Sequence, residues 1–305
     1  MDKIAVVTGA SRGFGRGIAY ILATEANYKV YATARNLGAL EKLKEEVSSN
    51  AGKGELIPYH LDQEDDEAVV EFVHRVTSSE NKIDLLVNSA YQGLIAMTPH
   101  FGKPFWERPI SVFDGHMNVG VRSSYVMSKL IAPAMIKEKN GLIVQISSYG
   151  GFVYFCDVGY GVSHAAMDRL SFDMATELRD YNVKAITLHP GAGQTEITAF
   201  PNGESPNYVG RAVLALVDQA DENFLTKANG KTLFTSDLSI KFGFKEDGDS
   251  NGSLNEARLE ASRPFKEMML KTPSHYDIEA SLPNYTDTNN EGFADLFPGA
   301  KNNRK

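Results

Sequence analysis

The feature that most constrains this chain is its beginning, where a short apolar run is followed directly by closely spaced glycines. Residues 3–8 (KIAVVT) predict a buried strand, and the apolar pattern of Ile18, Ile21 and Leu22 predicts a helix soon after it. Glycines stand between the two, at positions 9, 13, 15 and 17. Because glycines allow a tight turn and let phosphates approach a helix amino terminus, this arrangement predicts a dinucleotide site. An ordinary glycine-rich turn is the less favoured alternative.

Two arginines near the predicted phosphate site favour NADP(H) over NAD(H). The second apolar run, residues 29–33, leads into Ala34 and Arg35, where an acidic residue would bind the ribose 2′-hydroxyl of NAD(H). An arginine suits a 2′-phosphate instead, because its guanidinium presents a fork of donors. Arg12, within the glycine turn, is placed to contact the same phosphate. Two solvated surface arginines are the alternative.

Length and composition predict one large domain with an extension. At 305 residues, of which 42% are hydrophobic, the chain is long enough to bury one α/β core, and no linker divides it. Beyond Phe244 the composition shifts to Asp, Asn, Ser and Glu. We therefore expect residues 244–305 to form a polar, acidic extension that either wraps a neighbouring subunit or is partly disordered.

Charge, cysteine content and hydropathy exclude several classes of protein. A net charge of −8 and a pI near 5.4 argue against a nucleic-acid or anionic-membrane surface. The single cysteine, Cys156, excludes an internal disulfide framework and a cysteine-rich metal site, and it is expected to be a small apolar residue lining the substrate pocket. No apolar run approaches the roughly 18 to 20 residues that span a bilayer, and no signal peptide precedes the first strand, so a soluble, intracellular, cytoplasmic protein is expected.

A second segment, residues 141–164 (GLIVQISSYGGFVYFCDVGYGVSH), carries groups suited to catalysis. Its apolar start predicts a buried strand ending at Ser147 and Ser148, and a glycine-rich loop leads to Tyr160 at the start of a helix. A serine at the carboxyl end of a parallel strand and a tyrosine on the next helix are both placed to reach a carbonyl oxygen above the sheet. A tyrosine with an ordinary pKa near ~10 needs a neighbouring cation at neutral pH, and one helical turn on stands His164.

These residues resemble the catalytic segment of the short-chain dehydrogenase/reductase superfamily, whose signature is a serine followed by Tyr-x-x-x-Lys. The glycine turn from Thr8 to Gly15 also has the T-G-x-x-x-G-x-G form typical of that superfamily, and Asn88-Ser89-Ala90-Tyr91 matches its Asn-Asn-Ala-Gly segment in part. The spacing to Tyr160 is the usual one from Ser147 and one residue shorter from Ser148. The residues that follow favour Ser148 as the catalytic serine.

A Pro- and aromatic-containing insertion between Gln92 and Ser111 narrows the resemblance. Its Phe-Trp-Glu-x-Pro segment is similar to the dehydrogenase/reductase SDR family member 1 type. Loops of this length serve as lids or binding elements or are disordered, and Phe101, Phe105 and Trp106 argue against disorder.

The resemblance implies a fold and a set of roles. The fold is a single-domain, Rossmann-like, doubly wound parallel sheet of about seven strands with helices on both faces, over residues 1–243. Tyr160 would exchange the proton, Ser148 would stabilise the substrate oxygen, and Asn118 would bend a helix over residues 116–135 to hold a relay water. A solvent-facing Asn118 is the alternative. The implied cofactor-binding residues are Gly9, Ser11, Arg12, Gly13, Phe14, Gly15, Arg35, Asp62, Asn88, Tyr160, His164, Pro190, Gly191 and Thr195.

Two of these expectations have a structural alternative. Asp62 is implied to contact the adenine, but it also suits the cap of the acidic helix predicted over residues 63–79. A homodimer or homotetramer is implied as well, with part of the apolar face of the helix that runs from Tyr160 to about Asp180 as the contact. The alternative is that this face belongs to the internal core.

The lysine of the signature is absent, and His164 stands in its place. One ring nitrogen of a histidine can bind the nicotinamide ribose. A histidine replaces the positive charge of the missing lysine less well, because an imidazole with a pKa near ~6.5 is mostly neutral at pH 7 and loses further charge when buried. Reduced or acid-shifted activity is therefore expected.

Three functions follow from these residues. The preferred one is an NADP(H)-dependent carbonyl reductase or alcohol dehydrogenase that acts by hydride transfer on a lipophilic small molecule. The second is a cofactor-binding pseudoenzyme with little redox activity, and the third is non-redox elimination or isomerisation with Tyr160 and His164 as acid and base. The glycine turn and both arginines favour the first two, and intact Ser148, Tyr160 and Asn118 favour the first.

Overall fold

The computed structural model describes residues 3–50 and 54–271, and these form an α/β fold around one parallel sheet. The predicted seven parallel strands are confirmed, in the spatial order β3-β2-β1-β4-β5-β6-β7. Their bounds are β1 Lys3–Thr8, β2 Tyr28–Ala34, β3 Glu55–His60, β4 Leu85–Asn88, β5 Gly141–Ile146, β6 Val183–His189 and β7 Thr232–Phe234. The chain order reverses between β1 and β4, and ligands of open α/β sheets bind beside the carboxyl ends of strands at such a reversal.

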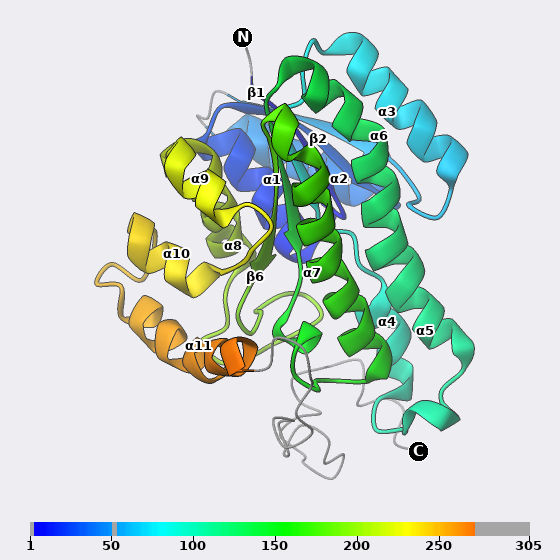
Figure 1. Ribbon diagram of the computed structural model, residues 1–305, viewed down its shortest axis with the longest axis vertical. Helices are drawn as coiled ribbons and strands as arrows, with labels where there is room; N and C mark the ends of the chain where they lie inside the picture. Colours follow the sequence, from blue (N-terminus) through cyan, green and yellow to red (C-terminus); the bar gives the residue numbers. More distant parts are fainter. Residues whose placement is uncertain (1–2, 51–53, 272–305) are drawn as a thin grey trace.

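Helices cover both faces of the sheet, as Figure 1 shows. Apolar side chains of α1, α2 and α8 form one buried core with the strands, and those of α3, α6 and α7 form the other. A strand that is buried on both faces has a continuous run of apolar residues, and this is why β1 and β5 could be predicted from the sequence. The bounds of these helices are α1 Gly13–Glu25, α2 Leu37–Ser49, α3 Asp66–Ser79, α6 Ser123–Glu138, α7 Val158–Leu178 and α8 Pro206–Leu214.

Close packing of α1 against α8 fixes the glycine turn that precedes α1. A Cβ atom at Gly17 would overlap the carbonyl group of Pro206, and one at Gly210 would lie 2.7 Å from the carbonyl oxygen of Gly17. The two backbones therefore touch directly at these glycines. This contact holds the amino terminus of α1 at the carboxyl end of β1, where the predicted phosphate site lies.

The helix predicted over residues 116–135, with a bend at Asn118, is kinked directly after that residue, although its bounds differ from the prediction. Helix α5 (Ile110–His116) ends before the kink, a distorted turn covers Met117–Arg122, and α6 begins at Ser123. Val119 and Gly120 have non-helical backbone angles. The turn is stabilised by Ser123 Oγ, which accepts a hydrogen bond from the Gly120 amide at 3.0 Å. A short helix, α4 (Gly93–Met97), lies beside α5 within the insertion at the lower end of Figure 1.

Helix α7 has both buried and exposed apolar side chains. Met167, Ala175 and Leu178 are buried in the core, whereas Val162 and Phe172 are exposed. The internal-core alternative is thus correct for the buried side chains, whereas the exposed ones do not belong to the core. The contact between copies of the chain stays a prediction.

The carboxyl-terminal region contains a long helix that the sequence pattern did not predict. After α9 (Glu222–Ala228), β7 and α10 (Thr235–Phe242), helix α11 spans Ser253–Lys271 and packs against α10. The buried positions of α11 include the polar residues Asn255, Arg258 and Ser262. A helix whose buried face is polar lacks the apolar period from which helices are predicted. The part of the predicted extension at residues 272–305 lies outside the described residues.

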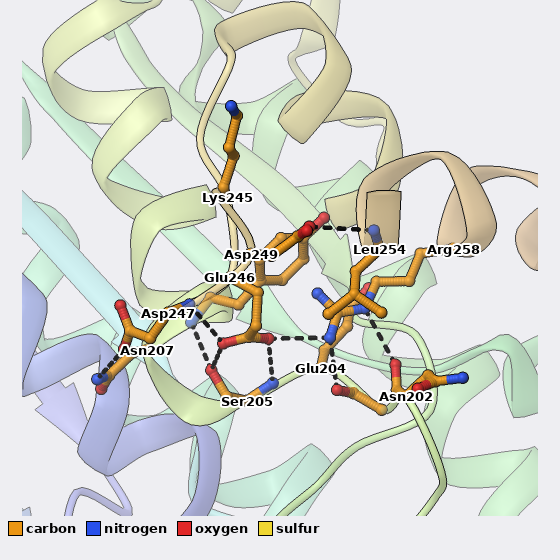
Figure 2. Close-up of polar contacts among 12 residues, drawn as sticks. Asn202, Glu204, Ser205, Asn207, Lys245, Glu246, Asp247, Asp249, Leu254 and Arg258 are labelled. Carbon is orange, nitrogen blue, oxygen red and sulfur yellow. Dashed lines mark hydrogen bonds and ion pairs between the residues drawn. The ribbon is translucent and has the colours of Figure 1, made fainter. Parts of the chain in front are cut away.

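Arg258 connects α11 to the loop before α8, as Figure 2 shows. Its guanidinium donates hydrogen bonds to the carbonyl oxygens of Asn202 at 3.2 Å and Gly203 at 2.6 Å, and it forms an ion pair with Glu246 at 2.9 Å. Glu246 in turn accepts a hydrogen bond from the amide of Ser205, the residue that caps α8. Arg258 is 8% exposed, so loss of either partner of the Arg258–Glu246 ion pair would leave the other charge largely buried and unpaired.

Replacing Arg258 by alanine should lower the free energy of unfolding by about 3 kcal/mol, because Glu246 would then be a buried charge without its partner. The matched control is Arg263→Ala on the same helix, whose ion pair with Glu260 is solvent-exposed and contributes little. Urea unfolding of both variants measures the difference. Equal losses in the two variants would contradict the role of Arg258.

Candidate active site

The carboxyl ends of the strands surround a cavity that brings most of the predicted site residues together. It extends from the glycine turn past β2 and β4 to the start of α7. Eleven predicted residues line this one cavity, from five separate parts of the chain: Gly9, Ser11, Arg12, Gly13, Phe14, Gly15, Arg35, Asp62, Tyr160, His164 and Thr195. The residues predicted to bind the cofactor therefore share one continuous cavity.

The remaining predicted residues do not line the cavity. Asn88 is buried beneath it and donates a hydrogen bond to Ser128 Oγ at 2.9 Å. Asn118 donates to the carboxylate of Glu64 at 3.1 Å, on the exposed side of the kinked segment, so its relay role stays a prediction. Ser148, Pro190 and Gly191 are likewise not among the lining residues, and Ser148 lies near the Tyr160 side chain, as described below.

The turn before α1 requires glycine at two positions. Gly9 has a φ of +70°, and a Cβ atom there would lie 2.7 Å from Cα of Ala90. A Cβ atom at Gly15 would lie 2.5 Å from the carbonyl oxygen of Gly9. These clashes explain why the turn is tight enough to aim the first amides of α1 into the cavity. In this structure the amide of Gly13 donates to the carboxylate of Glu196 at 2.9 Å, so an anionic group already lies where phosphates are expected.

Arg12 and Arg35 lie near each other at the rim of the cavity. The pKa of Arg12 is lowered, first by partial burial and also by the positive charge of Arg35, while Glu196 opposes this shift. Two like charges held together on the rim form a site for an anion. This electrostatic arrangement fits a 2′-phosphate.

Asp62 lines the cavity but does not cap α3. The cap of that helix is Asp65, whose carboxylate accepts a hydrogen bond from the amide of Ala68 at 3.0 Å. Asp62 instead accepts from the amide of Glu64 at 3.1 Å. The capping alternative for Asp62 was therefore wrong, and its adenine-binding role stays a prediction.

Tyr160 is held at the start of α7 by the helix cap. The carboxylate of Asp157 accepts a hydrogen bond from the Tyr160 amide at 2.6 Å, and Gly150 leaves room for the ring. The Tyr160 side chain forms a hydrogen bond with Ser148, which favours the phenolate. Burial dominates, however, and together with the nearby Cys156 thiol and the Asp157 carboxylate it raises the pKa of Tyr160 above its ordinary value.

Cys156 has a different place from the one expected. It is buried in a cluster with Met97, Val112 and Tyr160 and does not line the cavity. Burial raises the pKa of its thiol well above the usual range. It is therefore a protonated packing residue beside Tyr160.

The side chain of His164 lines the cavity and has one ring nitrogen without a hydrogen-bond partner among the described residues. It is 5% exposed, and its Nδ1 lies 3.2 Å from Oγ of Ser147, which also lines the cavity. Nε2 is buried and has no hydrogen-bond partner among the described residues. Burial, together with the positive charges of His189 and His116, holds the pKa of His164 well below its usual range. The imidazole is thus a neutral hydrogen-bonding group at pH 7.

A buried chain of polar groups next to Tyr160 was missed by sequence reasoning. The Tyr91 hydroxyl lies 2.6 Å from Nδ1 of His116, and His116 Nε2 lies 3.3 Å from the Asp157 carboxylate. Asp157 also forms an ion pair with Arg108 from the insertion. Tyr91 was noted where the superfamily has glycine. His116 and Arg108 carried no local signal, because only the folded insertion brings them to the cap of α7.

Unpartnered polar atoms in the cavity wall fit a polar ligand of extended shape. Four side chains that line the cavity have a buried nitrogen or oxygen without a partner in the described structure: Thr33, Gln63, Gln92 and His164. They are distributed from the part of the cavity near β2 to the part near α7. Buried polar groups normally have partners, so this distribution fits a dinucleotide. The described residues contain no cluster of three or more potential metal ligands and no helix long and apolar enough to cross a membrane.

Comparison with known proteins places these features in context. The family model described as short chain dehydrogenase matches residues 3–204. The mouse protein dehydrogenase/reductase SDR family member 1 is 37% identical over 265 residues, which cover 80% of this chain and 83% of the mouse protein.

Two solved structures share the fold. One is a metagenomic short-chain oxidoreductase in complex with NADP, at a TM-score of 0.64 and 28% identity, covering 76% of this chain and 96% of that one. The other is a 7α-hydroxysteroid dehydrogenase complexed with NADH and 7-oxo glycochenodeoxycholic acid, at a TM-score of 0.65 and 26% identity, covering 76% and 92%.

Replacing Glu196 by glutamine should tighten binding of a nicotinamide dinucleotide by roughly 3- to 10-fold. The carboxylate now accepts from the Gly13 amide and repels a phosphate at the amino terminus of α1. Fluorescence titration with NADPH measures the dissociation constant, and Glu177→Gln on the exposed surface of α7, outside the cavity, is the control. Unchanged or weaker binding in Glu196→Gln would show that Glu196 does not occupy the phosphate site.

Proposed function

The chain belongs to the short-chain dehydrogenase family, and we propose that it is an NADP(H)-dependent oxidoreductase that interconverts a carbonyl and a hydroxyl group. One observation carries this proposal: a single cavity joins the glycine turn and the two rim arginines to Tyr160 and His164. A nucleotide bound at the glycine turn would extend toward the tyrosine. The substrate carbonyl would then lie beside Tyr160.

The residues of the chain suit the proton half of this reaction. NADPH would supply the hydride. The Tyr160 hydroxyl donates its proton to the substrate oxygen during reduction and takes it back during oxidation. Ser148, hydrogen-bonded to Tyr160, stabilises the same oxygen. His164 Nε2, the unpartnered nitrogen, binds a ribose hydroxyl.

Apolar side chains around the catalytic end support a lipophilic substrate. Leu94, Val119, Ile146 and Ile197 line the cavity together with the ring of Tyr91. Such a wall excludes water from the reacting carbonyl and offers few polar partners to a small hydrophilic substrate. The proposed substrates are therefore lipophilic ketones, quinones or the corresponding alcohols.

A cofactor-binding protein without redox activity is the second candidate. The observation that favours it is the raised pKa of Tyr160 beside a neutral His164. Such a tyrosine gives up its proton reluctantly unless another positive charge assists it. NADPH binding without turnover would support this candidate.

NADPH oxidation in the presence of quinones, steroids and small ketones between pH 5 and 8 tests the main proposal. We expect turnover, and a loss of about 100-fold or more in Tyr160→Phe, because the proton donor is removed. Tyr125→Phe is the control, since Tyr125 is an exposed tyrosine on α6. Full activity in Tyr160→Phe would refute the assigned role, and tight NADPH binding without turnover would favour the second candidate.

The preference for NADP(H) is tested at the rim arginines. Replacing Arg35 by serine should weaken NADPH binding by roughly 10-fold or more and leave NADH binding nearly unchanged, because only NADPH carries the 2′-phosphate. Arg16→Ser is the matched control, as Arg16 lies on α1 outside the cavity and pairs with Glu46. Equal affinity of the native protein for NADPH and NADH would refute the proposed preference for NADP(H).

A further inference from the structure

The proposed reaction leaves an electrostatic problem at Tyr160. When Tyr160 donates its proton, a negative charge forms on a buried oxygen, and burial opposes that charge. A positive charge nearby would offset this cost. Two histidine rings contact Tyr160: His164, with ring centroids 4.2 Å apart, and His116, at 6.3 Å. The structure distinguishes the two by the charges around them.

No carboxylate lies within ion-pair distance of His164 in the part of the chain that the structure describes. Its Nδ1 contacts the neutral Ser147 hydroxyl, and the charges that act on it come from other histidines. A proton on this ring would be a buried charge without compensation. His164 is therefore suited to hydrogen bonding and not to carrying charge.

His116 lies in the opposite environment. It is fully buried, and its Nε2 is 3.3 Å from Oδ1 of Asp157. Burial opposes ionisation of Asp157, yet the nearby His116 ring, the Tyr160 amide and Arg108 keep the pKa of that carboxyl below its ordinary value. Asp157 lies between Arg108 and His116, so a proton on His116 would have a carboxylate partner, which a proton on His164 would lack.

The surrounding backbone leaves space for this histidine. A Cβ atom at Gly93 would overlap Nδ1 of His116, and one at Gly159 would lie 2.5 Å from its Cδ2. At Gly120, in the kinked segment, a Cβ atom would lie 2.9 Å from the ring of Tyr91. Glycines from α4, α7 and the kink thus make room for the Tyr91–His116 pair.

We propose that His116, held between Asp157 and Tyr91, is the positioning residue that supplies positive charge to Tyr160, while His164 acts as a neutral hydrogen-bonding group. This proposal rests on the proposed function. In the reduction, the O–H bond of Tyr160 breaks, a new O–H bond forms on the substrate oxygen, and the electron pair stays on the Tyr160 oxygen beside His116. Solvent then returns the proton to Tyr160.

Several titratable groups face His116, and each is a possible source of pH dependence. They are Tyr91 from the loop after β4, Asp157 at the cap of α7, and Tyr160 and His164 on α7, with Arg108 of the insertion behind Asp157. Among them His116 and His164 are the two that ordinarily titrate between pH 5 and 8. Substituting each histidine separately therefore identifies the source.

The first test is the pH profile of carbonyl reduction between pH 5 and 8 in the native protein, His116→Gln and His164→Gln. We expect the rate to fall as the pH rises in the native protein and in His164→Gln. In His116→Gln we expect a flat profile, with a rate at pH 6 about tenfold below the native rate. A flat profile in His164→Gln with a native profile in His116→Gln would overturn the proposal.

A second measurement does not depend on turnover. In protein with ¹³C-labelled tyrosine and histidine, assigned with Tyr160→Phe and the two glutamine variants, we expect the Tyr160 ring-carbon shift to follow the titration of His116. Tyr91→Phe, which keeps the ring and removes the hydroxyl contact, should alter that titration. A Tyr160 shift that follows His164, or neither histidine, would refute the proposal even if no substrate were found. Absence of turnover with the expected titration would instead count against the proposed function alone.

Discussion

The carboxylate of Asp157 is the group on which the site depends. It caps α7 through the Tyr160 amide, forms an ion pair with Arg108 and lies against His116. One side chain therefore sets the position of the tyrosine, attaches the insertion to the catalytic helix and compensates a buried histidine. A helix cap ordinarily contributes about 1 kcal/mol of stability. Here the cap is also the point at which Arg108 and His116 approach the start of the helix that carries Tyr160.

The carboxyl-terminal helix stabilises the opposite side of the site. Arg258 of α11 binds the carbonyls of Asn202 and Gly203, and the next residue, Glu204, exchanges backbone hydrogen bonds with residues 192 and 194. Glu204 is buried against Thr235 and the Gly191 amide, and burial raises the pKa of its carboxyl to about 7. On the same helix Phe265 stacks on Tyr149, the neighbour of Ser148. The loops that would hold nicotinamide and substrate therefore depend on contacts from α11, a helix that follows the last strand of the sheet.

The fold was predictable from the sequence because its strands are buried on both faces and its turns need glycine. The run KIAVVT and the glycines after it placed β1 and α1, and the apolar start at Leu142 placed β5. Eleven of the residues that the resemblance implied line one cavity, because the segments that carry them come together at one edge of the sheet. The His116–Asp157–Arg108 contact was not predictable, since it joins three segments through a loop of unknown path. Helix α11 was missed because Asn255, Arg258 and Ser262 give it a polar buried face.

Hydride transfer with Tyr160 as the proton donor is the activity that we propose for this chain. The most direct measurement is isotopic: the protein is incubated with NADPH deuterated at the transferable position and a ketone, and the alcohol product is analysed by mass spectrometry. Deuterium on the carbinol carbon, formed by the native protein and absent with Tyr160→Phe, is the predicted result. An alcohol product without deuterium, or bound NADPH that yields no alcohol from any lipophilic carbonyl, would contradict the account.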